Sequence, residues 1–304
     1  KLRSEKFEGS IAMVCKENHP PYQRPPLSKK YLLGEISLDR LYLRPLTFYE
    51  DQDIKLHLGK AVDLIDPAKK QVMFGNDSLE YDDLVLALGS DPRRLPETIG
   101  GQLGKVFTLR DLADVDALAP ELVEGKRVLI IGGGYIGLEA AAVAAQRGLN
   151  VTLVEMANRI LQRVAAPQTS DYFRTLHASH GVEIKEGVSL VKLTGSDGAV
   201  SGAELSDGTV LEIDFTIVGV GIIPVTDIAA DAGVSISDGI TVNALGQTSD
   251  QSIWAIGDCC SFPYKNGQLR LESVPHAIDQ SESVAQNIMG AKVDYVPKPW
   301  FWSD

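Results

Sequence analysis

One stretch of the chain restricts the fold more than any other, because a long apolar run is interrupted by a cluster of glycines. Val128–Ala145 is almost wholly apolar and contains the sequence Gly132-Gly133-Gly134-Tyr135-Ile136-Gly137. Its length is close to the ~20 residues of a membrane-spanning helix. The glycines and Glu139 argue against such a helix. We therefore expect a buried strand over 127–131, a turn at the glycines and a helix that ends near Gly148.

The glycine cluster fits the pattern G-x-G-x-x-G, which becomes informative because it lies between an expected strand and an expected helix. The free amides and positive dipole end of the helix suit a pyrophosphate, and glycine lets the backbone approach it. The next expected strand, 150–155, ends in Glu155, whose carboxylate can bind both hydroxyls of a ribose. The alternative is a packing turn followed by a solvated acid. An acid there repels a 2′-phosphate and favours NADH over NADPH, although Arg159 and Arg163 could contact a phosphate.

Two parts of the chain repeat one plan of short strands, turn residues and a closing apolar strand. The first covers residues 61–92 and closes at Gly89, and the second covers 189–224 and closes at Gly219 and Gly221. This similarity predicts two related nucleotide-binding units. The first residues of the chain resemble the end of the helix that follows the glycine loop in the second unit. We therefore expect the opening strand and the glycine loop of the first unit to be missing. The aromatic-rich end PWFWSD also predicts a fragment of a longer protein.

Composition and charge narrow the classes of function. The 304 residues are enough for about two domains at ~150 residues each. The net charge of −12 argues against a nucleic-acid partner. Three cysteines form no disulfide framework, and the N-terminal residues show no apolar signal core, so we expect a cytoplasmic protein that is not in a membrane.

Further motifs accompany the glycine loop in a fixed order. They are Tyr22-Gln23-Arg24-Pro25-Pro26-Leu27-Ser28-Lys29, Ala87-Leu88-Gly89 followed by Pro92-Arg93, Ile253-Trp254-Ala255-Ile256-Gly257-Asp258, and Pro299-Trp300-Phe301-Trp302-Ser303-Asp304. Together they resemble the FAD-dependent pyridine-nucleotide oxidoreductases, most closely the ferredoxin reductases that serve cytochrome P450 and Rieske oxygenase systems.

The resemblance implies an α/β fold with two doubly wound, Rossmann-like nucleotide-binding domains and the start of a third, α+β domain. The FAD-binding domain would comprise residues 1–105 and 226–290. The NAD-binding domain would comprise residues 106–225, and the C-terminal domain would begin at 291–304.

The resemblance also implies the residues of the cofactor sites. Those at FAD are Glu17, Arg24, Pro25, Lys29, Ala87, Gly89, Arg93, Gly257, Asp258, Val274 and His276. Those at NADH are Gly132, Gly134, Tyr135, Ile136, Gly137, Glu139, Glu155, Arg163, Val220 and Gly221. The implied catalytic residues are Lys29, near the reactive edge of the flavin, and Glu139, near the nicotinamide. Glu17 is a looser match because Cys15-Lys16 replaces the more usual Gly-Asp, and His276 stands where the family often has Asn.

The cysteines and histidines limit the chemistry. No C-x-x-C occurs, Cys15 falls on an expected strand, and a disulfide between the neighbours Cys259 and Cys260 would be strained. The chain therefore lacks the dithiol of a disulfide reductase, and electrons should leave from the flavin itself. We expect no metal site, and we interpret the pair His177 and His180 as part of a helix surface.

The expected activity is transfer of electrons from NADH through FAD to a [2Fe–2S] ferredoxin or a rubredoxin. A basic patch of Lys29, Lys30, Arg40 and Arg44 could receive an acidic partner, although scattered solvated charges explain these residues equally well. One alternative is an NADH oxidase or a reductase of peroxide or quinone. Another is a redox-sensing interaction protein similar to the apoptosis-inducing factors. A monomer and a homodimer are both left open.

Overall fold

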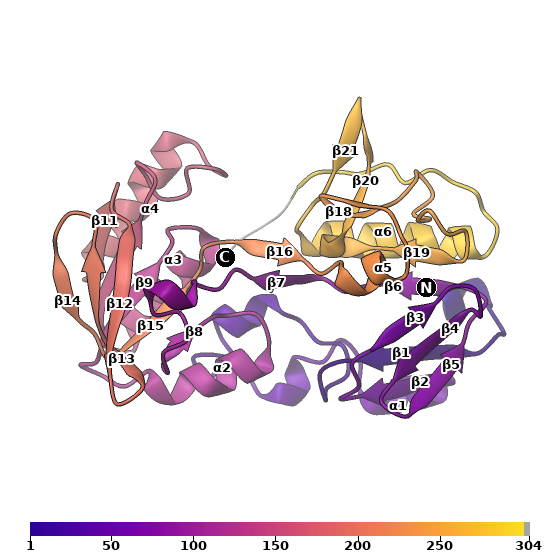
Figure 1. Ribbon diagram of the computed structural model, residues 1–304, viewed down its shortest axis with the longest axis horizontal. Coiled ribbons are helices and arrows are strands. Elements are labelled where there is room, and N and C mark those ends of the chain that lie inside the picture. The colour runs from indigo at the N-terminus through magenta and orange to yellow at the C-terminus, as the bar shows by residue number, and fades with distance from the viewer. Residues whose placement is uncertain (301–304) are drawn as a thin grey trace. The chain divides into compact units, whose positions relative to one another are not determined.

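The computed structural model describes residues 1–300, which form two compact units (Figure 1). Unit 1 contains residues 1–22, 42–91 and the described part of 223–304. Unit 2 contains residues 23–41 and 92–222.

Unit 2 is built on a five-stranded parallel sheet in the order β11-β10-β9-β15-β8. The strands are β8 (Val106–Phe107), β9 (Arg127–Ile131), β10 (Asn150–Glu155), β11 (Glu183–Glu186) and β15 (Phe215–Val218). The helices are α2 (Leu112–Leu118), α3 (Tyr135–Gln146) and α4 (Pro167–Ser179), with short 3₁₀ turns η2 (Pro25–Ser28), η3 (Leu38–Arg40), η4 (Glu97–Ile99) and η5 (Ala119–Glu121). The chain runs outward from the central strand β9 in both directions, which is the doubly wound arrangement.

A second, antiparallel sheet of unit 2 consists of β12 (Leu190–Ser196), β13 (Ala199–Leu205) and β14 (Val210–Glu212). The β12–β13 hairpin turns at Asp197-Gly198, where both residues have positive φ, 52° and 80°. Such a pair matches the twist of the flanking strands. Leu193, Val200 and Ala203 of this sheet pack into one apolar cluster with Leu129 and Val154 of the parallel sheet.

The described part of unit 1 contains two parallel strand pairs, one three-stranded antiparallel sheet and one four-stranded mixed sheet. The parallel pairs are β1 (Ile11–Cys15) with β2 (Ile54–Leu58), and β6 (Leu84–Leu86) with β19 (Ile253–Ala255). The other strands are β3 (Leu64–Asp66), β4 (Gln71–Phe74), β5 (Asp77–Glu80), β17 (Ile236–Ser237), β18 (Gly239–Thr241), β20 (Cys260–Tyr264) and β21 (Gly267–Leu269). The helices are α1 (Leu46–Asp51), α5 (Asp227–Asp231) and α6 (Val274–Ile288), with 3₁₀ turns η1 (Leu2–Glu5) and η6 (Gly257–Cys259). The short strands β7 (Ser90–Pro92) and β16 (Ile222–Pro224) pair with one another on the segments that connect the units.

The internal repeat predicted from the sequence is confirmed. In unit 1 the antiparallel sheet β3-β4-β5 is followed by the parallel strand β6, and in unit 2 the sheet β12-β13-β14 is followed by β15. The strand, turn and helix predicted for Val128–Ala145 are also confirmed, as β9, the glycine loop and α3. No helix within residues 1–300 is long and apolar enough to cross a membrane.

The unit boundaries differ from the domain boundaries expected from the sequence. Residues 23–41, expected with the segment 1–105, pack with unit 2. Arg24 Nη1 donates to the backbone oxygen of Arg110 at 2.9 Å, and Arg147 of the α3 C-terminus donates to that of Leu33. These contacts join residues that are far apart in sequence, which is why the local pattern did not reveal them. Which cofactor each unit binds stays a prediction.

The expected C-terminal domain also stays a prediction. Residues 291–300 contain no helix or strand, and Tyr295 N donates to Ala244 O at 2.8 Å within unit 1. The last four residues of the PWFWSD motif lie outside the described residues.

Candidate functional site

The glycine loop follows β9 at the carboxyl end of the parallel sheet. Gly132 has φ +106°, and a Cβ added there would lie 2.4 Å from Gly219 O. A Cβ added to Gly137 would lie 1.9 Å from Gly132 O. Both positions therefore exclude any side chain. The N-cap of α3 is Gly134, which makes no side-chain hydrogen bond to the helix, and the N-terminus of a helix suits an anionic ligand.

Glu155, which the sequence predicts to bind a ribose, contacts this loop through its carboxylate. Its Oε2 accepts from Gly133 N and its Oε1 from Ala157 N, both at 2.7 Å. A Cβ on Gly133 would lie 2.7 Å from Ile160 Cγ2, so the close approach of loop and carboxylate also depends on glycine. The expected preference for NADH stays a prediction.

Other residues predicted at NADH lie around the loop. The backbone nitrogen of Val220 is 3.5 Å from the position of a Cβ on Gly132, which places it beside the loop. Tyr135 and Ile136 form the first turn of α3, and Arg163 is exposed in the loop that precedes α4. Arg159 is held elsewhere, since its Nη1 donates to Ser170 Oγ at 2.7 Å.

A half-buried ion pair joins the two residues predicted to be catalytic. Lys29 Nζ lies 2.8 Å from Glu139 Oε1, and their side chains are only 21% and 12% exposed. Ser28 Oγ donates to Glu139 Oε2 at 2.5 Å, although Ser28 was absent from the predicted site. Because Lys29 turns toward Glu139, it does not extend an exposed basic patch with Lys30.

Arg93 and Gly221, predicted at FAD and at NADH respectively, are neighbours in unit 2. Arg93 N donates to Gly221 O at 2.9 Å. Gly221 has φ +105°, and Arg93 Cδ and Nε both lie 3.7 Å from the position of an added Cβ. A side chain at Gly221 would thus be strained and would touch the arginine. Pro25 begins η2, which contacts α3.

Four of the residues predicted at FAD lie in unit 1 where the parallel strands β6 and β19 end. Ala87 and Gly89 follow β6, and Gly257 and Asp258 follow β19. Ligands of parallel sheets bind at this edge. Gly257 has φ +72°, and its N–H donates to Gln280 Oε1 of α6 at 2.8 Å. Sequence analysis did not include Gln280, because only the fold brings α6 to this turn.

Two predicted FAD residues, Glu17 and His276, already have protein partners. The carboxylate of Glu17 accepts from the hydroxyl of Tyr22. His276 is 1% exposed, stacks on Phe262 at 4.9 Å between ring centres and lies 2.9 Å through Nδ1 from Tyr295 Oη. Burial lowers the pKa of His276 to about 4, so the ring is neutral at pH 7. Its contact with FAD stays a prediction, as does that of Val274, the exposed first residue of α6.

Two places fit the nucleotides predicted from the sequence: the glycine loop of unit 2 and the ends of β6 and β19 in unit 1. At the glycine loop, Gly132 and Gly137 let backbone segments pack closely, and a Cβ added to Gly134 would meet no atom within 4 Å, so the space beside Gly134 is open. In the described part of unit 1, six buried side-chain atoms lack a hydrogen-bond partner, and three of them belong to Ser90, which follows β6, and to His276 and Gln280 on α6. Buried polar atoms ordinarily have partners, so these atoms suit a polar ligand.

The expectation of a helix surface was wrong for His177. Its side chain is 8% exposed on the inner side of α4, and burial lowers its pKa. His180 lies just beyond the helix and is exposed. Within residues 1–300 no group of three or more His, Cys, Asp or Glu side chains is placed to hold a metal ion.

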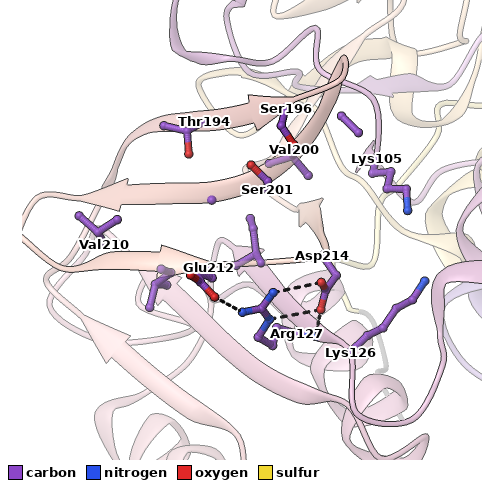
Figure 2. Close-up of a pocket in the computed structure, with 14 residues that line it drawn as sticks. Lys105, Lys126, Arg127, Thr194, Ser196, Val200, Ser201, Val210, Glu212 and Asp214 are labelled. Carbon is purple, nitrogen blue, oxygen red and sulfur yellow. Dashed lines mark hydrogen bonds and ion pairs between the residues drawn. The ribbon is translucent and has the colours of Figure 1, made fainter.

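A cavity of about 620 Å³ lies beside the β12-β13-β14 sheet, as Figure 2 shows. The cations that line it are paired, Arg127 with Asp214 and Glu212, and Lys105 and Lys126 with Glu121. Arg127 begins β9, so the cavity lies at the amino ends of the parallel strands. It is therefore separate from the glycine loop, and its ion pairs hold the edge of the sheet.

Comparison with known proteins agrees with the geometry. The family model described as pyridine nucleotide-disulphide oxidoreductase matches residues 1–281. The ferredoxin–NAD(P)(+) reductase fdr of Sphingomonas sp is 45% identical over 99% of the chain and 74% of its own length. Putidaredoxin reductase CamA of Pseudomonas putida is 38% identical over 100% of the chain and 74% of its own length.

Solved structures give the same result. The putidaredoxin reductase in a covalent complex with putidaredoxin matches with a TM-score of 0.94 at 38% identity, over 100% of this chain and 74% of that one. The ferredoxin reductase for the CYP199A2 system from Rhodopseudomonas palustris matches with a TM-score of 0.94 at 40% identity, over 100% and 75%. The chain belongs to the pyridine nucleotide-disulphide oxidoreductase family.

Proposed function

We propose that this protein is an NADH-dependent FAD flavoprotein that reduces a small iron–sulfur protein of the ferredoxin type. The observation that carries the proposal is the half-buried Lys29–Glu139 pair, because Glu139 belongs to the helix that begins at the glycine loop. The relatives support the acceptor class, since they include a putidaredoxin reductase and a rubredoxin-NAD(+) reductase of Pseudomonas putida.

The residues of unit 2 would bind and orient NADH. The first amides of α3 would receive the pyrophosphate, and Glu155 would exchange a backbone amide for the ribose hydroxyls. Lys29 would present a fixed positive charge, held by Glu139. FAD, when bound, supplies the step between a two-electron donor and a one-electron acceptor. Overall, one NADH and two oxidised ferredoxins give NAD⁺, one proton and two reduced ferredoxins.

The cysteines support an acceptor other than a disulfide. All three are free, and Cys259 and Cys260 are buried. Burial raises the pKa of Cys260 to about 12, so its thiol stays protonated and unreactive at pH 7. Free thiols also support a cytoplasmic location, which we include in the proposal and which cell fractionation with an antibody would test.

The test is an anaerobic titration of the FAD-reconstituted protein with NADH, followed by steady-state assays with several acceptors. We expect the flavin bands to bleach with about one equivalent of NADH, since one hydride reduces one flavin. We then expect a higher kcat/KM with a [2Fe–2S] ferredoxin or a rubredoxin than with oxygen, peroxide or a quinone. Faster turnover with oxygen, peroxide or a quinone than with the acceptor proteins would favour an NADH oxidase or a reductase of peroxide or quinone. Negligible turnover with every acceptor, together with a long-lived complex of reduced protein and NAD⁺, would favour a redox sensor.

A further inference from the structure

Ser28 provides a buried hydroxyl at the predicted catalytic pair. Its side chain is almost fully buried, with the residue 4% exposed. Its Oγ lies 2.5 Å from Glu139 Oε2 and 3.5 Å from Pro25 O. A hydroxyl has one proton to donate, and a carboxylate is the stronger acceptor. The hydrogen bond of Ser28 therefore goes to Glu139.

The two donors hold opposite oxygens of one carboxylate. Lys29 Nζ binds Oε1 at 2.8 Å, and Ser28 binds Oε2. The last torsion of a glutamate side chain is broad and is fixed poorly by its own rotamer preference. Donors on both oxygens restrict the turning of the carboxylate plane more than a donor on one oxygen does. The ammonium of Lys29 is then fixed as well, because it follows the oxygen that it contacts.

The backbone that carries both donors is itself restrained. Pro25 and Pro26 fix φ at the start of η2, and Leu27 is 3% exposed. Lys29 N donates to Pro26 O at 3.1 Å, which closes the turn, and η2 contacts α3. Ser28 therefore reaches Glu139 from a rigid support, and the hydrogen bond costs little conformational entropy.

We propose that Ser28 is a positioning residue, whose hydroxyl fixes the Glu139 carboxylate and thereby the Lys29 ammonium in the orientation used during flavin reduction. This inference rests on the proposed function. We expect the Ser28 hydroxyl to affect the rate of hydride transfer and to leave the affinity for NADH unchanged.

The first experiment uses the ligand-free protein. An infrared difference spectrum between wild type and Ser28→Ala should show a shifted carboxylate stretch, and the shift should be absent when the same pair is compared in a Glu139→Gln background. Urea unfolding of the four proteins should give non-additive free energies. Equal spectral differences in both backgrounds, or additive free energies, would overturn the proposal. Neither readout depends on flavin or on NADH.

The second experiment uses the FAD-loaded protein in anaerobic stopped flow. Ser28→Ala should reduce the limiting rate constant of flavin reduction about tenfold with an unchanged Kd for NADH, and Ser28→Thr should restore part of the rate. Ser179→Ala is the control, since Ser179 ends α4 in unit 2 and its hydroxyl donates to Leu176 O at 2.7 Å. A rate unchanged in Ser28→Ala, or lowered equally in Ser179→Ala, would overturn the proposal. If wild type itself is not reduced by NADH, the proposed function fails, and the ligand-free experiment still decides the role of Ser28.

Discussion

Substitution of Gly137 by alanine should damage the nucleotide-binding unit by a predictable amount. The added Cβ would lie 1.9 Å from Gly132 O, about 1.5 Å inside the ordinary contact distance between such atoms. Gly137 is the third residue of α3 and the oxygen is backbone, so neither atom can turn away. Forcing an atom into a filled site costs typically about 1–3 kcal/mol.

Two effects set the net change in the free energy of unfolding. Alanine in a helix is favoured over glycine by about 1 kcal/mol, which offsets part of the overlap. Because the overlap is with backbone, we take the upper part of the range and expect a net loss of about 2 kcal/mol. The glycine loop must also shift at Gly132 to relieve the overlap, so the Kd for NADH should rise at least about tenfold.

Urea unfolding followed by circular dichroism and a fluorescence titration with NADH would measure both effects. Gly134→Ala is the matched control, because Gly134 has φ −83° and no atom lies within 4 Å of its added Cβ. Its unfolding free energy should change by less than about 1 kcal/mol. If Gly137→Ala and Gly134→Ala unfold with the same free energy, the close approach of α3 to the glycine loop does not constrain the protein.

Three further predictions concern charged and titrating groups. The guanidinium of Arg127 lowers the pKa of Asp214, so this pair stabilises the fold above the unfolded pKa near 3.8 and the stabilisation is lost as the pH falls further. Asp214→Asn should therefore cost about 1–2 kcal/mol in urea unfolding at pH 7 and less at pH 3. Burial lowers the pKa of His276 from 6.5 to about 4. Between these two pH values the unfolded chain binds more protons than the folded protein, so the free energy of unfolding falls as the pH drops from 6.5 to 4. A wild-type loss of about 3 kcal/mol between pH 6.5 and 4 that is absent in His276→Asn would confirm this. Glu155→Gln replaces one of the oxygens that accept from Gly133 N and Ala157 N by an amide group. The Kd for NADH should rise about tenfold, and the Kd for NADPH should rise less. Parallel fluorescence titrations with the two nucleotides would check this.

The glycine loop shows what the sequence can predict. The strand bounds expected for Arg127–Ile131 and Asn150–Glu155 are those of β9 and β10, because an apolar run that stops at glycine leaves little choice of register. Glu155 was also placed correctly beside the loop, since it ends the neighbouring parallel strand. These features depend on contacts within one strand–helix–strand unit.

Features that depend on distant contacts were not predicted. Ser28 and Glu139 are 111 positions apart, and nothing in the residues around Ser28 indicates its partner. The segment 23–41 packs with unit 2 through residues such as Arg24 and Arg110, whose types are common on any surface. His177 was assigned to a helix surface together with His180, because two histidines three positions apart are common on helices, yet its side chain is buried. In each case the partner or the burial of a residue depends on which helices and strands pack together, and a single sequence gives little information about that packing.

The family name includes disulfide chemistry, and the cysteines of this chain argue against it in a way that can be measured. Cys259 Sγ lies 3.3 Å from Ile256 O, and Cys260 Sγ lies 3.2 Å from Gln280 Oε1. Both residues are fully buried, and burial raises the pKa of both thiols. A thiol-disulfide reductase needs an accessible thiolate, so these two should react with a thiol reagent only as fast as the protein unfolds. In a labelling time course on the native protein, we expect the half-buried Cys15 to react first and the other two to react together after urea is added. Rapid labelling of two thiols in the native state would instead show a reactive pair and would reopen a disulfide substrate as the acceptor.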